Sequence, residues 1–269
     1  MESLHHLKRP FGSLDYQISP LGLGTVKFGR NLHIKNACGD GQPLPSTAVC
    51  TTLLEKALEL GVNFIDTAPA YGAAEEALGK IISPSIRKNI IITTKVGEFF
   101  DTRTGTSQHH FDRKTTTASI EASFQNLNTD YLDFIFVHCS HNDLENLNNT
   151  DVLPTLARFK EKGLIRGFGA SVYTQQAAQY ALNHTDGLMI TYNLNDSQHR
   201  TTLQKAYELK KAVVIKKGFL QGHLGEKGPE PALKHILQQP IHSIVCGTLN
   251  PDHLAQNADI TARLIRGYR

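Results

Sequence analysis

The sequence predicts an α/β fold in which short parallel strands alternate with helices, and two observations carry that prediction. Apolar, β-branched runs recur along the chain, and several are nearly continuously apolar, as expected for strands buried on both faces of a parallel sheet. Longer segments with helical periodicity lie between these runs. The length agrees, because 269 residues divided by eight gives about 34 per strand–helix unit. A closed barrel and an open doubly wound sheet both fit this alternation.

The predicted strands and helices can be placed in order along the chain. The strand-like runs are 20–25, 62–66, 89–95, 132–138, 165–171, 187–191, 212–216 and 242–246. The helical segments are 46–61, 73–82, 114–128, 152–163, 174–184, 197–211, 230–239 and 251–267. We expect Ser46 to cap the first of these helices and Gly61 to end it. Asn250 followed by Pro251 is a typical start for the last helix.

The remaining segments are predicted to be loops of a single domain spanning 1–269, since no linker or low-complexity tract divides the chain. GLGTVKFG at 22–29 lacks the spacing of the G-x-G-x-x-G fingerprint, and no helix follows it directly. This disfavours a dinucleotide-binding open sheet. The segments 30–45 and 97–112 are predicted as long loops, and we expect the second to overhang a site.

Composition excludes several classes of function. The net charge of +3 and the absence of a dense basic run disfavour nucleic acid as a partner. The four cysteines are far apart, without a C-x-x-C pair, and no histidine cluster has zinc-ligand spacing, so no metal is expected. The amino terminus lacks the apolar core of a signal peptide, and no apolar run is long enough to span a membrane. A cytoplasmic location without membrane contact is the resulting expectation.

Polar side chains interrupt the apolar runs at the ends of the predicted strands. Asp66, Lys95 and His138 each end a different run, and Tyr71 follows Asp66 within DTAPAYG. In a parallel barrel such ends converge on one mouth, where catalytic groups lie. Each residue alone is more often a turn former, a solvated charge or a packed ring, whereas the joint arrangement favours a site. The four suit proton transfer to a carbonyl oxygen: a lysine would lower the tyrosine pKa, an aspartate would hold the lysine, and a histidine would donate a hydrogen bond to the substrate.

The order Asp66, Tyr71, Lys95, His138 resembles the catalytic tetrad of the aldo-keto reductases, in particular bacterial members with a short carboxyl terminus. The resemblance continues in IITTKVG, TDYLDFIFVH, GLIRGFGAS, TYNLND, FLQGHL and GTLNPDHLAQN. It implies a (β/α)8 TIM barrel that binds an extended nicotinamide dinucleotide without a Rossmann domain. It also implies interconversion of aldehydes or ketones and alcohols by hydride transfer, with Tyr71 as general acid/base. Family members that reduce steroid carbon–carbon double bonds carry Glu where this chain has His138, so it resembles the carbonyl reducers.

The same resemblance implies a set of cofactor contacts. They are Gly24, Thr25, Asp66, Ser171, Lys216, Phe219, Leu220, Gly222, Gly247, Thr248, His253, Gln256 and Asn257. Val172 and Met189 stand where polar carboxamide contacts are expected beside Ser171, and Lys216 replaces the aromatic residue that usually stacks on the nicotinamide. His253 replaces an arginine of the 2′-phosphate pocket, and a neutral histidine offers less charge to a phosphate. NADP(H) is favoured, with NAD(H) as the alternative.

Two functions fit these observations. The favoured one is an NAD(P)(H)-dependent oxidoreductase acting on a small carbonyl or alcohol substrate. The alternative is a cofactor-binding sensor or regulatory subunit with slow turnover, because channel-associated members of the family also keep the tetrad. The chain ends soon after the last predicted helix, so we expect an open mouth shaped by loops 26–45, 97–112 and 139–150. Such a mouth would suit small aldehydes, quinones or sugars. The oligomeric state does not follow from the sequence.

Overall fold

The computed structural model describes residues 2–33, 41–226 and 228–267. Residues 34–40, part of the loop predicted at 30–45, lie outside the described residues, and so does Cys38.

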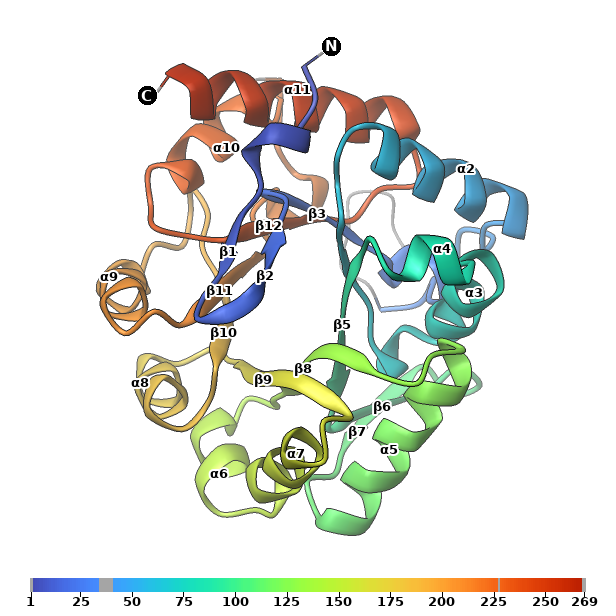
Figure 1. The fold of residues 1–269 in the computed structure, drawn as a ribbon, viewed down its shortest axis with the longest axis vertical. Coiled ribbons are helices and arrows are strands. Elements are labelled where there is room, and N and C mark those ends of the chain that lie inside the picture. The colour runs from blue at the N-terminus through green and yellow to red at the C-terminus, as the bar shows by residue number, and fades with distance from the viewer. Residues whose placement is uncertain (1, 34–40, 227, 268–269) are drawn as a thin grey trace.

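Within the described residues, eight parallel strands close into a barrel surrounded by helices (Figure 1). Around the barrel the strands are neighbours in the order β10, β11, β12, β3, β4, β5, β8, β9. Their bounds are β3 (Leu21–Gly24), β4 (Phe64–Asp66), β5 (Ile91–Val96), β8 (Leu132–His138), β9 (Ile165–Ser171), β10 (Gly187–Thr191), β11 (Ala212–Lys216) and β12 (Ser243–Cys246). Pairing of β12 with β3 closes the ring, with Val245 opposite Gly22. The (β/α)8 TIM barrel is therefore confirmed, and the open sheet is wrong.

The helices lie outside the barrel and follow the predicted segments closely. The long ones are α2 (Thr47–Glu59), α3 (Ala74–Ile81), α5 (Arg113–Asn126), α7 (Val152–Glu161), α8 (Gln175–His184), α9 (Arg200–Glu208), α10 (Glu230–Leu237) and α11 (Pro251–Gly267). Short helices that the sequence analysis did not predict are η1 (His5–Leu7), α1 (Val26–Gly29), η2 (Pro69–Tyr71), α4 (Pro84–Arg87), α6 (Asp143–Asn148) and η3 (Leu220–Gly222). Ser46 caps α2 as predicted, since its side chain accepts a hydrogen bond from the amide of Val49. None of the helices in the described part of the chain has the length and apolar character needed to cross a membrane.

Two antiparallel hairpins lie outside the barrel. One pairs β1 (Arg9–Phe11) with β2 (Leu14–Ile18), and the other pairs β6 (Glu98–Asp101) with β7 (Thr106–His109). The second hairpin corrects the prediction that 97–112 is a loop. Its four-residue strands carry mostly polar side chains, so the apolar runs used to find the barrel strands are absent there.

The first hairpin covers the amino-terminal end of the barrel. Phe11 is fully buried there, and its ring centroid lies 5.6 Å from that of Phe64 and 5.2 Å from that of Phe134. These side chains belong to an inner cluster that also contains Phe136 and Met189. The interior of the barrel is thus a packed core, and any site must lie at its ends or rim.

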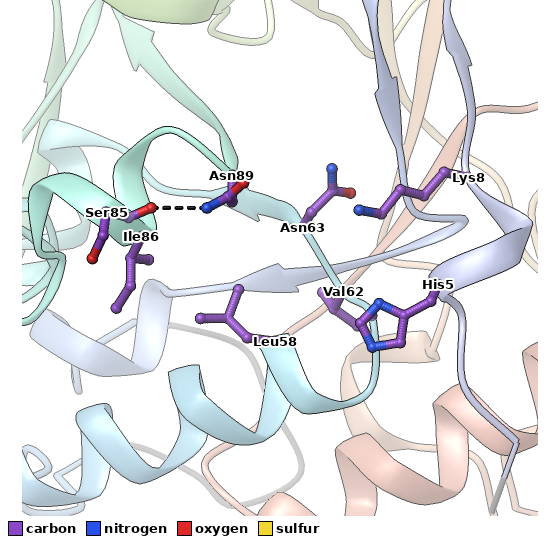
Figure 2. A pocket seen from close by; sticks show the side chains of 9 residues that line it. His5, Lys8, Leu58, Val62, Asn63, Ser85, Ile86 and Asn89 are labelled. Carbon is purple, nitrogen blue, oxygen red and sulfur yellow. Dashed lines mark hydrogen bonds between the residues drawn. The ribbon is translucent and has the colours of Figure 1, made fainter.

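A pocket at the amino-terminal end of the barrel lies beside this hairpin (Figure 2). It is lined by residues that include His5 and Lys8, together with Asn63 and Asn89 just before β4 and β5. Asn63 has a structural role, because its side-chain oxygen accepts a hydrogen bond from the amide of Ser19 at 2.7 Å. None of the predicted site residues lines this pocket.

Replacing Phe11 by Ala is expected to destabilise the protein by about 3–5 kcal/mol, because it leaves a cavity between the hairpin and the inner cluster. Denaturant unfolding followed by circular dichroism measures the change. Asp15→Ala, at an exposed position of β2 in the same hairpin, is the matched control and should cost less than about 0.5 kcal/mol. Equal effects of the two substitutions would contradict a role of Phe11 in closing the barrel.

Candidate functional site

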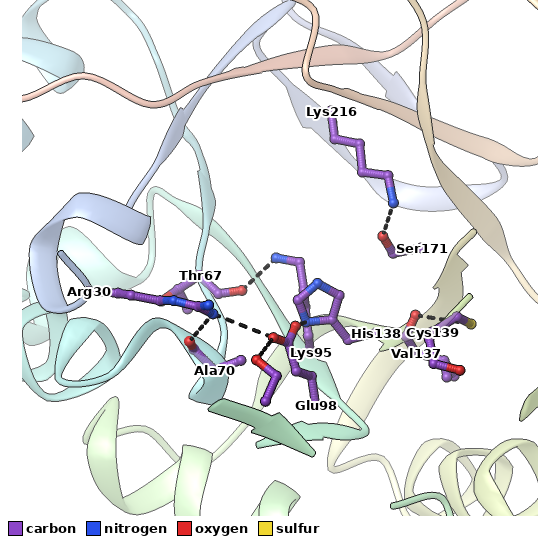
Figure 3. A network of polar contacts seen from close by, with 12 residues as sticks. Arg30, Thr67, Ala70, Lys95, Glu98, Val137, His138, Cys139, Ser171 and Lys216 are labelled. Carbon is purple, nitrogen blue, oxygen red and sulfur yellow. Dashed lines mark hydrogen bonds and ion pairs between the residues drawn. The ribbon is translucent and has the colours of Figure 1, made fainter. Parts of the chain in front are cut away.

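Barrel closure brings the four predicted catalytic residues to one mouth. Asp66 ends β4, His138 ends β8, and Lys95 lies one residue before the end of β5. Tyr71 ends η2, in the loop that follows β4. Because the barrel strands are parallel, their carboxyl ends lie on the same side, and residues far apart in the sequence meet there. Figure 3 shows Lys95 and His138 close together in this mouth.

The best-defined contact in the mouth is a buried ion pair between Lys95 and Asp66. Nζ of Lys95 donates hydrogen bonds of 2.7 Å to Oδ1 of Asp66 and 2.7 Å to the carbonyl oxygen of Thr67. The two charged side chains are only 2% and 4% exposed. Thr93 adds a 2.9 Å hydrogen bond to the same carboxylate oxygen. Burial lowers the pKa of Lys95, and the Asp66 carboxylate opposes that shift.

Tyr71 lies against this pair and beside His138. The Lys95 ammonium lies 4.8 Å from the centre of the Tyr71 ring, and the His138 ring meets the tyrosine edge-on with 6.3 Å between centroids. Burial raises the pKa of Tyr71 well above 10, and the carboxylates of Asp66 and Glu98 raise it further. The expectation that the pKa of Tyr71 is lowered is therefore wrong for the structure described, because burial and the two carboxylates outweigh any favourable effect of the Lys95 charge. Since the lysine donates to Asp66 and Thr67, its charge is balanced by a carboxylate.

Two glycines allow the loop that carries Tyr71 to pack against α1. A Cβ on Gly29 would lie 2.2 Å from the amide nitrogen of Ala74, and one on Gly72 would lie 2.2 Å from the carbonyl oxygen of Gly29. Gly72 also has a φ of 61°, a backbone conformation that residues with a side chain rarely adopt. The backbone approach that places Tyr71 therefore requires both glycines, and no sequence pattern singled out either of them.

Glu98 is a polar partner of the tetrad that sequence reasoning missed. It lies on β6, and its Oε2 is 2.8 Å from Nδ1 of His138. Its other oxygen accepts hydrogen bonds from Ser107 at 2.6 Å and Arg30 at 3.4 Å. Burial alone would raise the pKa of Glu98, but His138, Ser107 and Arg30 hold it well below its usual range. Burial lowers the pKa of His138, against the opposing effect of Glu98.

Lys216 is the second buried lysine of the mouth. It ends β11, and its Nζ donates a 2.8 Å hydrogen bond to the hydroxyl of Ser171 at the end of β9 (Figure 3). The same ammonium lies 4.1 Å from the centre of the Tyr173 ring. Among the described residues, no carboxylate forms an ion pair with it. Burial, with the charge of Lys217, lowers the pKa of Lys216 to about 7.

The other residues implied to contact a cofactor follow strand ends on the same side of the barrel. Gly24 ends β3 and Thr25 follows it, with the Thr25 hydroxyl donating to the carbonyl oxygen of Asp66 at 3.0 Å. The rest come after β11 or β12, namely Phe219, Leu220, Gly222, Gly247, Thr248, His253, Gln256 and Asn257. His253 and Gln256 are exposed on α11, whereas the buried Asn257 amide contacts the Sγ of Cys246 at 3.2 Å.

Two residues stand where polar side chains are expected to contact the carboxamide of the nicotinamide, but neither side chain can donate a hydrogen bond. Val172 is fully buried, and Met189 is 2% exposed within the inner cluster. Cys139, next to His138, is also buried, and burial raises the pKa of its thiol. In the described part of the chain, no three histidine, cysteine, aspartate or glutamate side chains form a group that could hold a metal ion.

Removing the charge of Asp66 is expected to destabilise the fold, since it leaves a buried ammonium without its carboxylate. Asp66→Asn should cost about 3–5 kcal/mol in denaturant unfolding, and the double variant Asp66→Asn/Lys95→Met should recover most of that loss. The exposed Lys56–Glu59 pair, with 2.9 Å between its charged atoms, supplies the control. Glu59→Gln should cost less than about 1 kcal/mol. A double variant no more stable than Asp66→Asn would show that the uncompensated charge is not the cause.

Comparisons with known proteins point to one family. A sequence model of the Aldo/keto reductase family matches residues 20–193. The chain is 27% identical over 237 residues to the “Uncharacterized oxidoreductase YqkF” of Bacillus subtilis, covering 86% of this chain and 71% of that protein. It is 26% identical over 237 residues to the L-galactose dehydrogenase of Arabidopsis thaliana, covering 82% and 68%. A crystal structure from Pseudomonas aeruginosa, assigned to the aldo-keto reductases, has a TM-score of 0.88 at 37% identity, covering 98% of this chain and 97% of its own.

Proposed function

Because the chain belongs to the aldo/keto reductase family, we propose that it interconverts small carbonyl compounds and alcohols with Tyr71 as the proton donor to the carbonyl oxygen. Family membership and the oxidoreductase relatives make it an NAD(P)H-dependent oxidoreductase. The observation that carries the finer proposal is the placement of Tyr71, whose ring centre lies 4.8 Å from the Lys95 ammonium and whose ring meets His138 edge-on.

The residues at the mouth fit a nicotinamide dinucleotide. Lys216 is a buried amine that lacks a carboxylate partner within the described chain, a donor suited to the polar and anionic groups of such a cofactor. A Cβ on Gly247 would meet only ordinary contacts at 4.0 Å, with the carbonyl oxygen of Gly24 and the Val26 side chain, so the backbone there is uncrowded on that side. At the start of α11, Pro251 has no amide proton, and the amides of Asp252 and Leu254 already donate to Asn250, which leaves the His253 amide of the first turn for a phosphate. We infer that Lys216, Ser171 and the start of α11 hold the cofactor.

The proposed chemistry divides between cofactor and protein. When bound, the nicotinamide supplies the hydride that reaches the carbonyl carbon. Tyr71 donates its phenol proton to the carbonyl oxygen as negative charge develops there. Lys95 lies close enough to stabilise the charge left on the tyrosine, and Asp66 keeps the lysine in place. His138 borders the same space and contacts the substrate oxygen.

The size and polarity of the mouth favour a small substrate. A pocket of about 330 Å³ opens beside the tetrad, and its lining includes Glu98, His109, His141, Asn142 and Tyr173. These residues belong to the segments 97–112 and 139–150, which were predicted to shape the mouth, and to the loop that follows β9. Charged, aromatic and amide groups together suit hydroxylated aldehydes or sugars, a class that includes the substrate named for L-galactose dehydrogenase.

Tyr71→Phe is expected to lower kcat for aldehyde reduction at least about 100-fold while leaving cofactor affinity unchanged, since only the proton donor is lost. NAD(P)H oxidation over a panel of aldehydes, with calorimetric cofactor titration, measures both quantities. Tyr16→Phe is the matched control, because it removes a hydroxyl that bonds to the carbonyl oxygen of Asp133, away from the tetrad. Near-normal reduction by Tyr71→Phe would refute the proposed role. Tight cofactor binding by the unmodified protein without turnover of any substrate would favour a sensor instead.

NADPH is expected to bind more tightly than NADH. Because the chain contains no tryptophan, cofactor fluorescence enhancement or calorimetry is the suitable measurement. His253→Arg should strengthen NADPH binding about tenfold without changing NADH binding, since an arginine adds charge for the 2′-phosphate alone. Equal or tighter binding of NADH by the unmodified protein would overturn the preference.

A further inference from the structure

Glu98 contacts the imidazole of His138 at the nitrogen that faces away from the centre of the mouth. Its Oε2 lies 2.8 Å from Nδ1 (Figure 3). In this view the second ring nitrogen points away from Glu98, toward the side where the Lys95 and Lys216 side chains end. The ring is thus held at Nδ1, and Nε2 remains available to a ligand in the mouth.

The carboxylate itself is held in place from several directions. Ser107, on the opposite strand of the hairpin, donates to Oε1 at 2.6 Å, and Arg30 donates to the same oxygen at 3.4 Å. The Arg30 guanidinium also lies 3.6 Å from the centre of the Phe100 ring and donates to the carbonyl oxygen of Ala70 at 3.2 Å. Arg30 thereby connects the hairpin that carries Glu98 with the loop that carries Tyr71.

The protonation states of the pair follow from this arrangement. The same contacts favour the ionised form of Glu98, and an ionised carboxylate only accepts hydrogen bonds. The contact is an ion pair without hydrogen-bond geometry, but a carboxylate oxygen 2.8 Å from a ring nitrogen repels a lone pair there, so the ring proton belongs on Nδ1 of His138. A neutral imidazole carries one ring proton, so Nε2 of a neutral His138 is an acceptor. That nitrogen becomes a donor only in the imidazolium form.

We propose that Glu98 is a positioning residue that fixes the tautomer of His138, so that Nε2 accepts from an alcohol when the ring is neutral and donates to a carbonyl when it is charged. The assignment of the substrate oxygen to Nε2 rests on the proposed function. Carbonyl reduction then uses the imidazolium, which the Glu98 charge stabilises, whereas alcohol oxidation uses the neutral ring.

Other charges in the mouth act on the same ring. Lys95 on β5 and Lys216 on β11 disfavour the imidazolium, as burial does, and Tyr71 on η2 meets the ring edge-on without a charge of its own. Arg30 and Asp66 lie one contact further away, on Glu98 and Lys95. Glu98 is thus the group that favours the charged ring against several that oppose it. Its removal must lower the pKa of His138, so that the imidazolium persists only at lower pH.

Nitrogen-15 histidine NMR on the whole protein tests the pair directly and without substrate. His138→Gln identifies the signals of His138 among the thirteen histidines. We expect the neutral ring to carry its proton on Nδ1, and Glu98→Gln to lower the pKa of His138. Asp101→Asn is the matched control, since it removes a carboxylate from the same strand that contacts Arg103 and leaves His138 unchanged. Glu98→Asp, which keeps the charge, should restore part of the shift.

Kinetics provide the second readout. Glu98→Gln should reduce aldehydes about tenfold more slowly than the unmodified protein at pH 7. The difference should shrink as the pH falls, because a lower pH protonates His138 even when Glu98 no longer stabilises the imidazolium. A merely structural role would lower the rate equally at every pH.

The outcomes separate the two proposals. The role of Glu98 would be overturned if the neutral His138 ring of the unmodified protein carried its proton on Nε2. It would also be overturned if the pKa of His138 were the same in Glu98→Gln. The first result is obtained on the unmodified protein, so it does not depend on whether a variant folds. If NMR finds the expected tautomer and pKa shift but the protein reduces no carbonyl compound, the role of Glu98 in fixing the His138 tautomer is retained and the proposed function is refuted.

Discussion

The mouth of the barrel is built around the need to bury the charge of Lys95. An ammonium that is 2% exposed loses most of its hydration, a loss that only close partners offset. Asp66 and the carbonyl oxygen of Thr67 supply them at 2.7 Å each, and both come from the end of β4 and the residue after it. The pair therefore ties β5 to β4 at the point where the loop carrying Tyr71 begins. The same contact adds to the pairing of β4 with β5 and sets the charge beside Tyr71.

The two buried lysines of the mouth are set up for different tasks. Lys95 is balanced by the Asp66 carboxylate, which opposes the lowering of its pKa by burial, and it serves as a fixed neighbour for Tyr71. Lys216 has only a hydroxyl and an aromatic ring for partners, and burial lowers its pKa to about 7. A buried amine of this kind gains most from a ligand that brings polar or negative groups. The same residue type thus supports chemistry in one place and binding in another.

Arg30 and Glu98 connect parts of the mouth that the barrel strands alone would not hold together. Arg30 contacts the backbone at Ala70, the ring of Phe100 and the carboxylate of Glu98, and Glu98 in turn contacts His138. Movement of the β6–β7 hairpin would therefore alter the surroundings of both Tyr71 and His138. Because burial and these contacts act together, the four tetrad residues, Glu98 and Arg30 influence one another's protonation, and no pKa in the mouth is set by one residue alone.

Local pattern was enough to predict the barrel strands, the long helices and the tetrad positions. Buried parallel strands must be apolar along their length, so Asp66, Lys95 and His138 were conspicuous where they ended such runs. The partners of those residues depended on tertiary structure. Glu98 begins a four-residue strand whose two central phenylalanines are too few to give a periodic signal, and only the folding of its hairpin over the mouth places it 2.8 Å from His138. Likewise, the expected convergence of strand ends suggested that Lys95 would lower the pKa of Tyr71, whereas burial and nearby carboxylates raise it. The amino-acid sequence determines which ionisable groups are present. Their protonation depends on desolvation and on charges nearby in space, and both arise only when the chain has folded.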